Sequence, residues 1–227
     1  MPDNRADFTA ALLAQGLTPE HAAQLTRYAE LVLEGNTRCN LTAARSFEAL
    51  LPHILDSLTF RHDVVESLVD VGSGGGFPAI PLAIVTGVKV TMIESVAKKA
   101  KFLAHASEVL ALNATVLQGR AEKFALEEQY RDTFRCATAR AVAVTPAVME
   151  LLLPFLRLEG VAIIQRGGLE DKERRASEDA ALVLGGELIE ERLLEGVRRL
   201  LYVRKVRPTP WRFPRKNGIP VKYPLCM

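Results

Sequence analysis

A glycine-rich stretch at residues 68–80, LVDVGSGGGFPAI, constrains the fold of this chain more than any other feature. A short apolar run leads into glycines at positions 72, 74, 75 and 76, and an apolar helical pattern follows from Pro78 to Val85. A strand, a tight turn and a helix N-terminus in that order bind the polar parts of nucleotide-like ligands. Glycine suits the turn because its backbone can adopt positive φ and no side chain blocks the ligand. The stretch therefore predicts a ligand-binding βα unit, with a purely structural turn as the alternative.

The spacing of the glycines distinguishes between classes of ligand. The dinucleotide pattern G-x-G-x-x-G, started at Gly72, requires glycine at position 77, where this chain has Phe77. Asp70 and Gly74 instead give D-V-G-S-G-G-G, an acidic residue followed by G-x-G-x-G. This pattern is typical of methyltransferases that use S-adenosylmethionine (AdoMet), a ligand with an ammonium group and no pyrophosphate. We therefore expect AdoMet, and not NAD, as the cofactor.

A second candidate cofactor contact lies one βα unit further along the chain. Lys89 to Ile93 is expected to form a buried strand that ends in Glu94, 22 residues after Gly72. An acidic side chain at such a strand end can accept hydrogen bonds from both hydroxyls of an adenosine ribose. A solvated loop carboxylate is the alternative interpretation of Glu94, and the glycine turn makes it the weaker one.

From Ser67 onward, strand and helix patterns alternate, which predicts a mostly parallel sheet with helices on both faces. Strands are expected near 68–72, 89–94, 114–118, 135–140 and 160–165, and helices near 78–86, 96–111, 145–156 and 169–184. Residues 186–194 and 198–206 then form a hairpin. A hairpin that closes a parallel sheet with an antiparallel last strand is typical of the class I AdoMet-dependent methyltransferase fold. We therefore predict this Rossmann-like α/β fold with seven strands.

The residues before the sheet have a helical pattern. Helices are expected over 7–15 and 19–35, followed by a loop at 36–44. Another helix begins after Ser46, with a kink or a new start at Pro52. We accordingly divide the chain into an N-terminal helical extension (1–66), a methyltransferase core (67–207) and a basic C-terminal tail (208–227).

Composition excludes several classes of protein. The 227 residues are 48% hydrophobic and 25% charged, as in an ordinary globular protein. Three cysteines, Cys39, Cys136 and Cys226, are far apart and form no C-x-x-C, so neither a disulfide framework nor a zinc site is expected. There is neither a run of about 18 apolar residues nor an apparent signal peptide. We therefore expect a cytoplasmic protein with no metal and no membrane association.

The C-terminal residues are strongly basic. Residues 198–227 contain nine Lys or Arg and no Asp or Glu, so the other 197 residues hold 20 basic and 27 acidic side chains, a net charge of −7. This asymmetry suggests a polyanionic partner that approaches from one side. Trp211, Phe213 and Tyr223 lie among the cations, which favours RNA, bound through phosphate pairing and base stacking. A solubilising tail is the alternative.

Several short motifs together are more specific than the glycine turn alone. In order, they are Asn40-Leu41-Thr42, His53-Ile-Leu-Asp56-Ser57, DVGSGGGFPAIPLAI, Ala121-Glu122-Lys123-Phe124, Ala139-Arg140-Ala141 and Arg215-Lys216-Asn217-Gly218. From about residue 10 to the C-terminus, the chain resembles the 16S ribosomal RNA (guanine(527)-N(7))-methyltransferase family, RsmG or GidB. The resemblance implies methyl transfer from AdoMet to N7 of a guanine in the 16S rRNA of the small ribosomal subunit. We expect the enzyme to be a monomer.

The resemblance assigns cofactor contacts position by position. Gly72 and Phe77 match positions where the family binds AdoMet, and Ala121 and Glu122 match the pair beside the adenine. Arg140 matches an arginine at the methionine end of the cofactor, facing the target base. Whether Arg140 binds guanine O6, a phosphate or the cofactor carboxylate is left open by the sequence.

The candidate substrate contacts are polar residues on both sides of the core. They are Asn40, His53, Asp56, Arg212, Arg215 and Lys216. His53 and Asp56 are three residues apart on one helical face, where they either tether the N-terminal helices to the core or contact the substrate. Asn40 has the further alternative of satisfying loop backbone groups.

The chemistry implied for guanine N7 needs no catalytic residue. N7 has an in-plane lone pair and no proton, so its attack on the sulfonium methyl requires no general base. No Ser-His-Asp or Cys-His arrangement stands out, and the chain has only four histidines. Catalysis then comes from holding N7 in line with the methyl group, which can contribute about 7–11 kcal/mol.

Three other functions remain as alternatives. A class I methyltransferase with another substrate shares the same motifs, although the basic C-terminus argues against a small molecule. An NAD-dependent oxidoreductase requires glycine at position 77, and the short-chain class also requires Y-x-x-x-K, whereas Tyr202 and Lys205 are only three residues apart. A non-catalytic RNA-binding module leaves Glu94 and the glycine turn unexplained.

Overall fold

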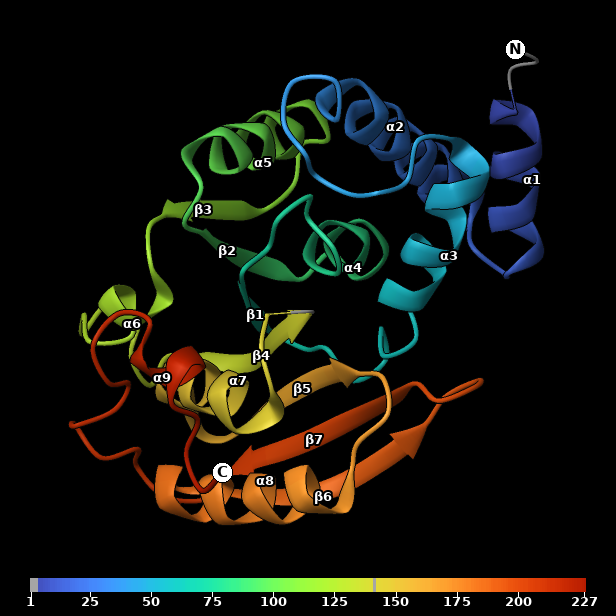
Figure 1. The fold of residues 1–227 in the computed structure, drawn as a ribbon. Coiled ribbons are helices and arrows are strands. Elements are labelled where there is room, and N and C mark those ends of the chain that lie inside the picture. Colours follow the sequence, from blue (N-terminus) through green and yellow to red (C-terminus); the bar gives the residue numbers. More distant parts are fainter. Residues whose placement is uncertain (1–3, 141) are drawn as a thin grey trace.

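The structure, a computed structural model, describes residues 4–140 and 142–227 and is built around a seven-stranded sheet (Figure 1). Ala141 of the Ala-Arg-Ala motif lies outside the described residues. The strand order is β3-β2-β1-β4-β5-β7-β6. The strands are β1 (Ser67–Val71), β2 (Lys89–Glu94), β3 (Ala114–Gln118), β4 (Phe134–Arg140), β5 (Leu156–Arg166), β6 (Gly186–Leu193) and β7 (Arg199–Lys205). The pairs among β1 to β5 are parallel, whereas β7 lies antiparallel between β5 and β6, which confirms the predicted fold class.

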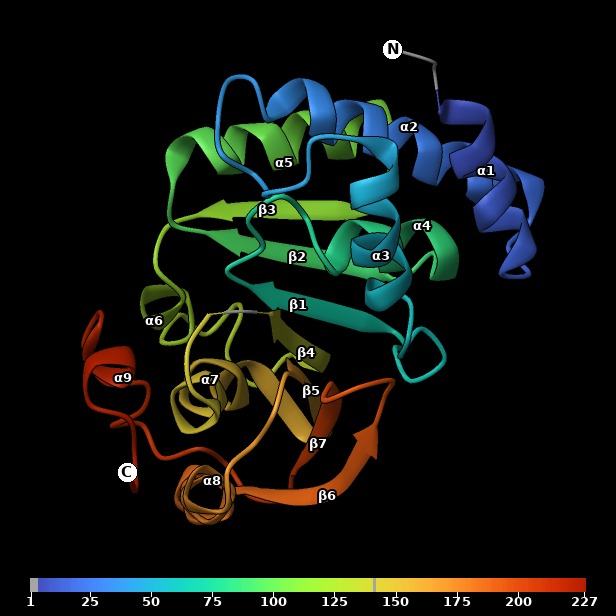
Figure 2. The same cartoon turned by 45° about the vertical axis from the view of Figure 1, so that its right-hand side comes forward.

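The helices cover both faces of the sheet (Figure 2). They are α1 (Arg5–Ala14), α2 (Pro19–Gly35), α3 (Phe47–Ser57), α4 (Ala79–Thr86), α5 (Ala97–Val109), α6 (Ala121–Phe124), α7 (Thr145–Leu152) with a 3-10 turn (Leu153–Phe155), α8 (Asp171–Leu184) and α9 (Ile219–Lys222). Helices α1 to α5 share one hydrophobic core with one face of the sheet, and α6 to α8 share a second core with the other face. None of the helices described is both long and apolar enough to cross a membrane.

Side-chain alternation along the strands divides the two cores. In β1, Leu68 packs in the core under α1 to α5, whereas Val69 and Val71 pack in the core under α6 to α8. The N-terminal helices bury residues such as Leu25 in the same core as the sheet. The boundaries proposed for the three parts of the chain stay a prediction.

The helix α3 differs from the expectation of a kink or new start at Pro52. It runs from Phe47 to Ser57 as one element, and the Ser46 hydroxyl accepts a hydrogen bond from the Ala49 amide. Pro52 is exposed, so the carbonyl that loses its helical donor can be solvated by water. The four-residue helices α6 and α9 were not predicted, because one helical turn leaves no periodicity in the sequence.

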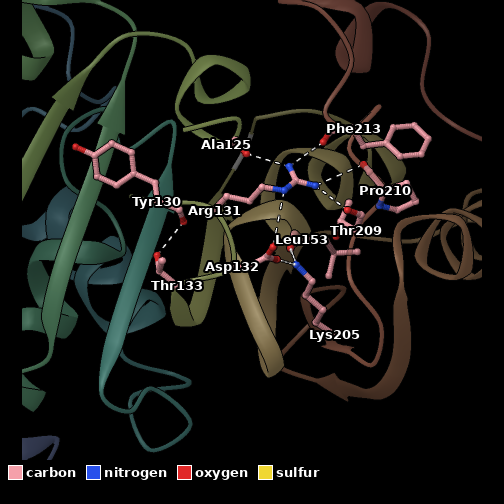
Figure 3. Close-up of polar contacts among 10 residues, drawn as sticks. All are labelled: Ala125, Tyr130, Arg131, Asp132, Thr133, Leu153, Lys205, Thr209, Pro210 and Phe213. Carbon is pink, nitrogen blue, oxygen red and sulfur yellow. Dashed lines mark hydrogen bonds and ion pairs between the residues drawn. The ribbon is translucent and has the colours of Figure 1, made fainter. Parts of the chain in front are cut away.

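The C-terminal segment is held to the core by Arg131, which lies just before β4 (Figure 3). Its side chain is buried, and its guanidinium donates hydrogen bonds to the carbonyls of Ala125, Thr209, Pro210 and Phe213. The Trp211 ring stacks on the same guanidinium, 4.3 Å from Cζ to the ring centroid. Beside it, the buried Lys205 ammonium pairs with Asp132 and donates to the Leu153 carbonyl. Residues 209–213 are therefore anchored to the folded core.

A second anchor of the C-terminal segment joins Arg215 to Glu150 of α7. Glu150 is fully buried, and its carboxylate accepts hydrogen bonds from Nε and Nη2 of Arg215 at 2.6–3.0 Å and from the Arg215 amide at 2.7 Å. Pairing of this kind offsets the cost of burying a carboxylate. The ion pair fixes the turn that leads into α9, which lies beside α6 and α7 in both views (Figures 1 and 2).

We expect Arg131→Ala to lower the free energy of unfolding by about 2–5 kcal/mol, because it leaves buried carbonyls without a donor. Arg131→Lys should recover little of the loss, since a single ammonium cannot span four carbonyls. Chemical denaturation measures the change, and trypsin cleavage at Arg212 or Lys216 reports release of the segment. Arg157→Ala, at an exposed ion pair with Glu66, is the matched control and should change stability by less than about 1 kcal/mol. Equal effects of the two alanine substitutions would contradict the role given to Arg131.

Candidate cofactor and substrate site

The candidate site lies at the carboxyl ends of the parallel strands, where the strand order reverses between β1 and β4. Ligands of open α/β sheets bind at such a reversal point. The glycine turn follows β1, Glu94 ends β2, and Arg140 ends β4. The structure therefore brings three groups of predicted cofactor contacts to one edge of the sheet.

The glycine turn is held in shape from both sides. Gly72, Gly74 and Gly76 have φ of +76°, +57° and +98°, a region that glycine adopts without strain. From the side of the N-terminal helices, the buried Tyr28 hydroxyl of α2 donates a 2.7 Å hydrogen bond to the Gly75 carbonyl. Tyr28 was not singled out from the sequence, because 47 residues separate it from the group it binds.

Glu94 holds the turn from the side of β2. One carboxylate oxygen accepts from the Gly74 amide at 2.9 Å, and the other accepts from the Val96 amide at 2.7 Å. The residue is buried, so it is not the solvated loop carboxylate of the alternative interpretation. Each carboxylate oxygen has a further lone pair, which leaves acceptors for two ribose hydroxyls.

Asp70 is the unusual charge of the site. It is fully buried at the end of β1, and neither carboxylate oxygen has a hydrogen-bond partner within residues 4–140 and 142–227. Burial raises the pKa of Asp70 to about 7, although the Ser73 hydroxyl and the Arg140 charge favour the ionised form. An unpartnered buried carboxylate beneath a glycine turn complements a ligand ammonium group. Asp70 is therefore a candidate partner for the ammonium group of AdoMet, but it lines neither of the two cavities described below, and this contact stays a prediction.

A cavity of about 370 Å³ lies beside the glycine turn on the α6 and α7 side of the sheet. It is lined by Val71, Gly72, Ser95, Gly119, Arg120, Ala121, Glu122, Val142 and Leu151, and by Gly218, Val221 and Lys222 of the C-terminal segment. The Glu122 carboxylate is buried and accepts from the Gly218 amide at 2.8 Å and from Arg120 at 3.0 Å. Burial raises the pKa of Glu122, but these hydrogen bonds outweigh it and the net pKa is lowered. Glu122 thus stays ionised and joins the C-terminal segment to the cavity wall.

A second cavity, of about 430 Å³, lies at the end of β4 and is flanked by α3. Its lining comprises Pro52, His53, Asp56, Arg140, Gln165, Arg166, Gly167, Leu194 and Arg198. Arg140 contacts this cavity, whereas Val142, two residues later, contacts the first one. The two cavities therefore flank the end of β4.

Arg140 is held by the polar residues of α3. Its Nη2 lies 2.8 Å from Nδ1 of His53, and its Nη1 lies 3.6 Å from the Asp56 carboxylate, which also pairs with Arg198 at 2.8 Å. Because arginine only donates, Nδ1 of His53 accepts and Nε2 carries the proton. Burial, and then the Arg140 charge, lower the pKa of His53, while Asp56 partly opposes them. At neutral pH the cavity therefore has a neutral imidazole and a fixed guanidinium.

Phe77 lies on the same side as this second cavity. Its ring packs 5.3 Å from the Tyr28 ring, 6.0 Å from the His53 ring and 5.6 Å from Cζ of Arg140. The side chain is not among those that line the first cavity. It orients Arg140 and His53, and a cofactor contact by this residue stays a prediction.

The chain was compared with known proteins. Residues 21–201 match the GidB family, described as rRNA small subunit methyltransferase G. This chain belongs to the GidB, or RsmG, family. The protein named ribosomal RNA small subunit methyltransferase G from Halalkalibacterium halodurans is 39% identical, covering 96% of this chain and 98% of the relative. The protein of the same name from Rubrobacter xylanophilus is 42% identical, covering 97% of this chain and 91% of the relative.

Solved structures support the fold. M. jannaschii TYW2 in complex with AdoMet is 16% identical, with a TM-score of 0.54, covering 68% of this chain and 76% of that one. A SAM-dependent methyltransferase from Aquifex aeolicus is 17% identical, with a TM-score of 0.53, covering 70% of this chain and 93% of that one. The predicted family, the methyltransferase fold and AdoMet as the cofactor are thereby confirmed.

The candidate substrate residues fall into different environments. Asn40 is exposed and accepts from Arg45 at 3.3 Å. The loop at 36–44 is organised instead by Asn36, whose amide binds the Ala44 carbonyl and the amides of Leu41 and Thr42. Asn36 therefore satisfies backbone groups of this loop, a role that the sequence does not reveal. Substrate contact by Asn40 stays a prediction.

The three cations proposed in the C-terminal segment also differ from one another. Arg212 and Lys216 are exposed, whereas the guanidinium of Arg215 binds the buried Glu150. Arg215 therefore has a structural partner that the sequence did not reveal. Its proposed contact with RNA stays a prediction.

We expect the affinity for S-adenosylhomocysteine to fall as the pH drops from about 7.5 to 5.5. Below a pKa of about 7, the ligand ammonium must displace a proton from Asp70, which costs up to about tenfold in affinity per pH unit. Calorimetry at several pH values measures this, with Asp70→Asn as the comparison. A variant with weaker binding but the same pH dependence would contradict the assignment of the proton to Asp70.

The raised pKa of Asp70 should also affect how the stability of the ligand-free protein depends on pH. Because the folded-state pKa is raised, the contribution of Asp70 to stability is fully present below about pH 4 and is lost as the pH rises through about 7. Asp70→Asn should therefore gain stability relative to the unmodified chain above pH 7. Thermal unfolding at pH 5 and pH 8 provides the control for the binding experiment.

Proposed function

We propose that this chain transfers the methyl group of AdoMet to N7 of the guanine at position 527 of 16S ribosomal RNA. Its family makes it an AdoMet-dependent rRNA methyltransferase of the small subunit. The choice of guanine N7 as the methylated atom is supported by the pair of cavities that flank the end of β4, with Arg140 in the wall of one of them. A base in the cavity of about 430 Å³ lies next to the position where the methionine end of the cofactor is expected.

The proposed chemistry agrees with the hydrogen bonds around this cavity. The cofactor supplies an electrophilic methyl group on a sulfonium. In one step the N7–carbon bond forms and the sulfur–carbon bond breaks, the sulfur keeps the electron pair, and no proton leaves the base. His53 and Asp56 are bound to arginines and are not arranged as a general base. Their role in this proposal is to hold Arg140 and Arg198 in place.

The oxidoreductase alternative finds no support in the residues it would use. The Tyr202 hydroxyl binds Asp63 at 2.6 Å, and the Lys205 ammonium is buried against Asp132 and the Leu153 carbonyl. The two side chains leave β7 on opposite faces, since three residues separate them. They therefore cannot act together as a tyrosine–lysine pair.

Methyl transfer to small subunits that lack the modification tests the proposal. With labelled AdoMet, we expect about one methyl group per particle. Borohydride reduction and aniline cleavage should map it to N7 of the target guanine. Particles that already have the modification are the control and should accept no label. If the label is found in another base or in a ribosomal protein, the proposed substrate is wrong.

We propose further that the enzyme acts as a monomer in the cytoplasm. The proposed location is supported by the family, which is described as an rRNA small subunit methyltransferase. Sedimentation of the purified chain at the concentrations used for turnover tests the monomer.

The C-terminal segment is the proposed RNA contact outside the cavities. Trp211, Arg212 and Lys216 line a hollow of about 680 Å³ beside α6, and the Trp211 side chain is 66% exposed. An exposed indole between cations is suited to stack on a base while the cations pair with phosphates. Arg131 holds this surface in place through its hydrogen bonds to the carbonyls of Thr209 and Phe213.

Replacing Arg212 and Lys216 together by alanine should flatten the salt dependence of RNA binding by about 1.4 in log–log slope, or about 0.7 per phosphate contact. The RNA KM should rise, and the affinity for S-adenosylhomocysteine should not change. Arg215 is left in place because its loss would strip Glu150 of its partner. Lys89→Ala with Arg157→Ala removes two charges at the amino ends of β2 and β5 and is the matched control. If both double variants keep the salt dependence of the unmodified chain, the C-terminal segment does not bind RNA and its charges serve only solubility.

A further inference from the structure

Gln165 is a residue of the second cavity to which neither the motifs nor the family match assigns a role. It lies at the end of β5, paired in register with Arg140 of β4. Its side-chain amide nitrogen donates a 2.8 Å hydrogen bond to the backbone carbonyl of Asp56 in α3. Because a carbonyl can only accept, this bond fixes which end of the amide is nitrogen and which is oxygen.

The amide oxygen of Gln165 is a buried acceptor without a donor. The residue is only 8% exposed, and Oε1 has no hydrogen-bond partner anywhere in residues 4–140 and 142–227. Buried side-chain acceptors are paired in most proteins, because an unpaired one costs about 1–3 kcal/mol. Because Gln165 lines the second cavity, a ligand bound there is the candidate donor for this acceptor.

The other polar groups of this cavity mostly donate. Arg140, Arg166 and Arg198 supply guanidinium groups, and His53 has its proton on Nε2. The carboxylate of Asp56 is already shared between Arg198 and Arg140. A ligand that fits this set has acceptors for the arginines and a donor for Gln165.

Guanine has this arrangement, and adenine does not. Its O6 and N7 accept hydrogen bonds, while N1–H and the 2-amino group donate from the opposite side of the base. Adenine has only a C–H at the position of the 2-amino group and would leave the Gln165 oxygen unpaired. Adenine also has a nucleophilic N7. An enzyme that catalyses only by positioning N7 against the methyl group therefore needs a group that binds guanine and excludes adenine.

We propose that Oε1 of Gln165 accepts a hydrogen bond from the 2-amino group of the target guanine and so selects guanine as the methylated base. The inference rests on the proposed function and names its specificity-determining residue. The Asp56 carbonyl holds the amide in the orientation that reads the base. Binding at the 2-amino edge leaves N7, on the opposite side of the ring system, free of contact with Gln165.

The test combines a change in the base with a change in the protein. Inosine lacks only the 2-amino group of guanosine and keeps O6 and N7. For small subunits reconstituted with inosine at the target position, we expect single-turnover methylation at least about tenfold slower than with guanosine, because the Gln165 oxygen loses its donor. In Gln165→Met, which keeps the side-chain length without the amide, the two rates should agree within about twofold.

The ratio of the two rates separates base reading from a general loss of activity. Gln129→Met, at an exposed glutamine far from the cavity, is the matched control and should keep the ratio of the unmodified chain. Affinity for S-adenosylhomocysteine should be the same in all three proteins. Equal rates for guanosine and inosine in the unmodified chain overturn the inference, even if Gln165→Met fails to fold. A ratio that persists in Gln165→Met also overturns it.

Failure of the proposed function gives a different result. Chemical mapping then finds the methyl group on an atom other than N7, or on another base, whatever the ratio of rates. Correct mapping with no discrimination against inosine leaves the proposed function intact and removes only the role of Gln165.

Discussion

The glycine turn after β1 depends on hydrogen bonds from two separate elements. The Tyr28 hydroxyl of α2 binds the Gly75 carbonyl, and the Glu94 carboxylate at the end of β2 binds the Gly74 amide. A turn with several residues at positive φ gains flexibility from glycine, so outside contacts are needed to select one conformation. The Tyr28 contact joins the N-terminal helices to the loop at which the cofactor is expected, because α2 supports that loop.

The partners of the buried charges distinguish structural ion pairs from candidate binding groups. Glu150 has Arg215, and Lys205 has Asp132, so both are satisfied within the chain. Asp70 is as deeply buried and has no partner among the residues described. Since an unpaired buried carboxylate is expensive, its neutral form is favoured until a cation arrives. The same argument, applied to the neutral amide of Gln165, makes the second cavity a candidate binding site.

Local patterns predicted the parts of the fold that local sequence determines. Strand and helix alternation, the antiparallel β7, and the placement of Gly72 and Glu94 at one edge follow from periodicity and spacing within each βα unit. The residues that the sequence did not reveal act over long separations: Arg131 binds carbonyls 78 to 82 residues later, and Gln165 binds one 109 residues earlier. A single sequence gives no signal for such contacts, so Arg215 was interpreted as an RNA contact before its buried partner was known.

The C-terminal segment contributes to two separate hollows. Its inner side contributes Gly218, Val221 and Lys222 to the first cavity, where the cofactor is expected, while its outer side presents Trp211 and Arg212 in the hollow proposed to contact RNA. Arg131, Glu150 and Glu122 each hold a different part of it to the core. Because these three anchors lie within the chain itself, the position of the segment does not depend on either ligand. One anchored segment therefore contributes both to the cavity where the cofactor is expected and to the hollow where RNA contact is proposed.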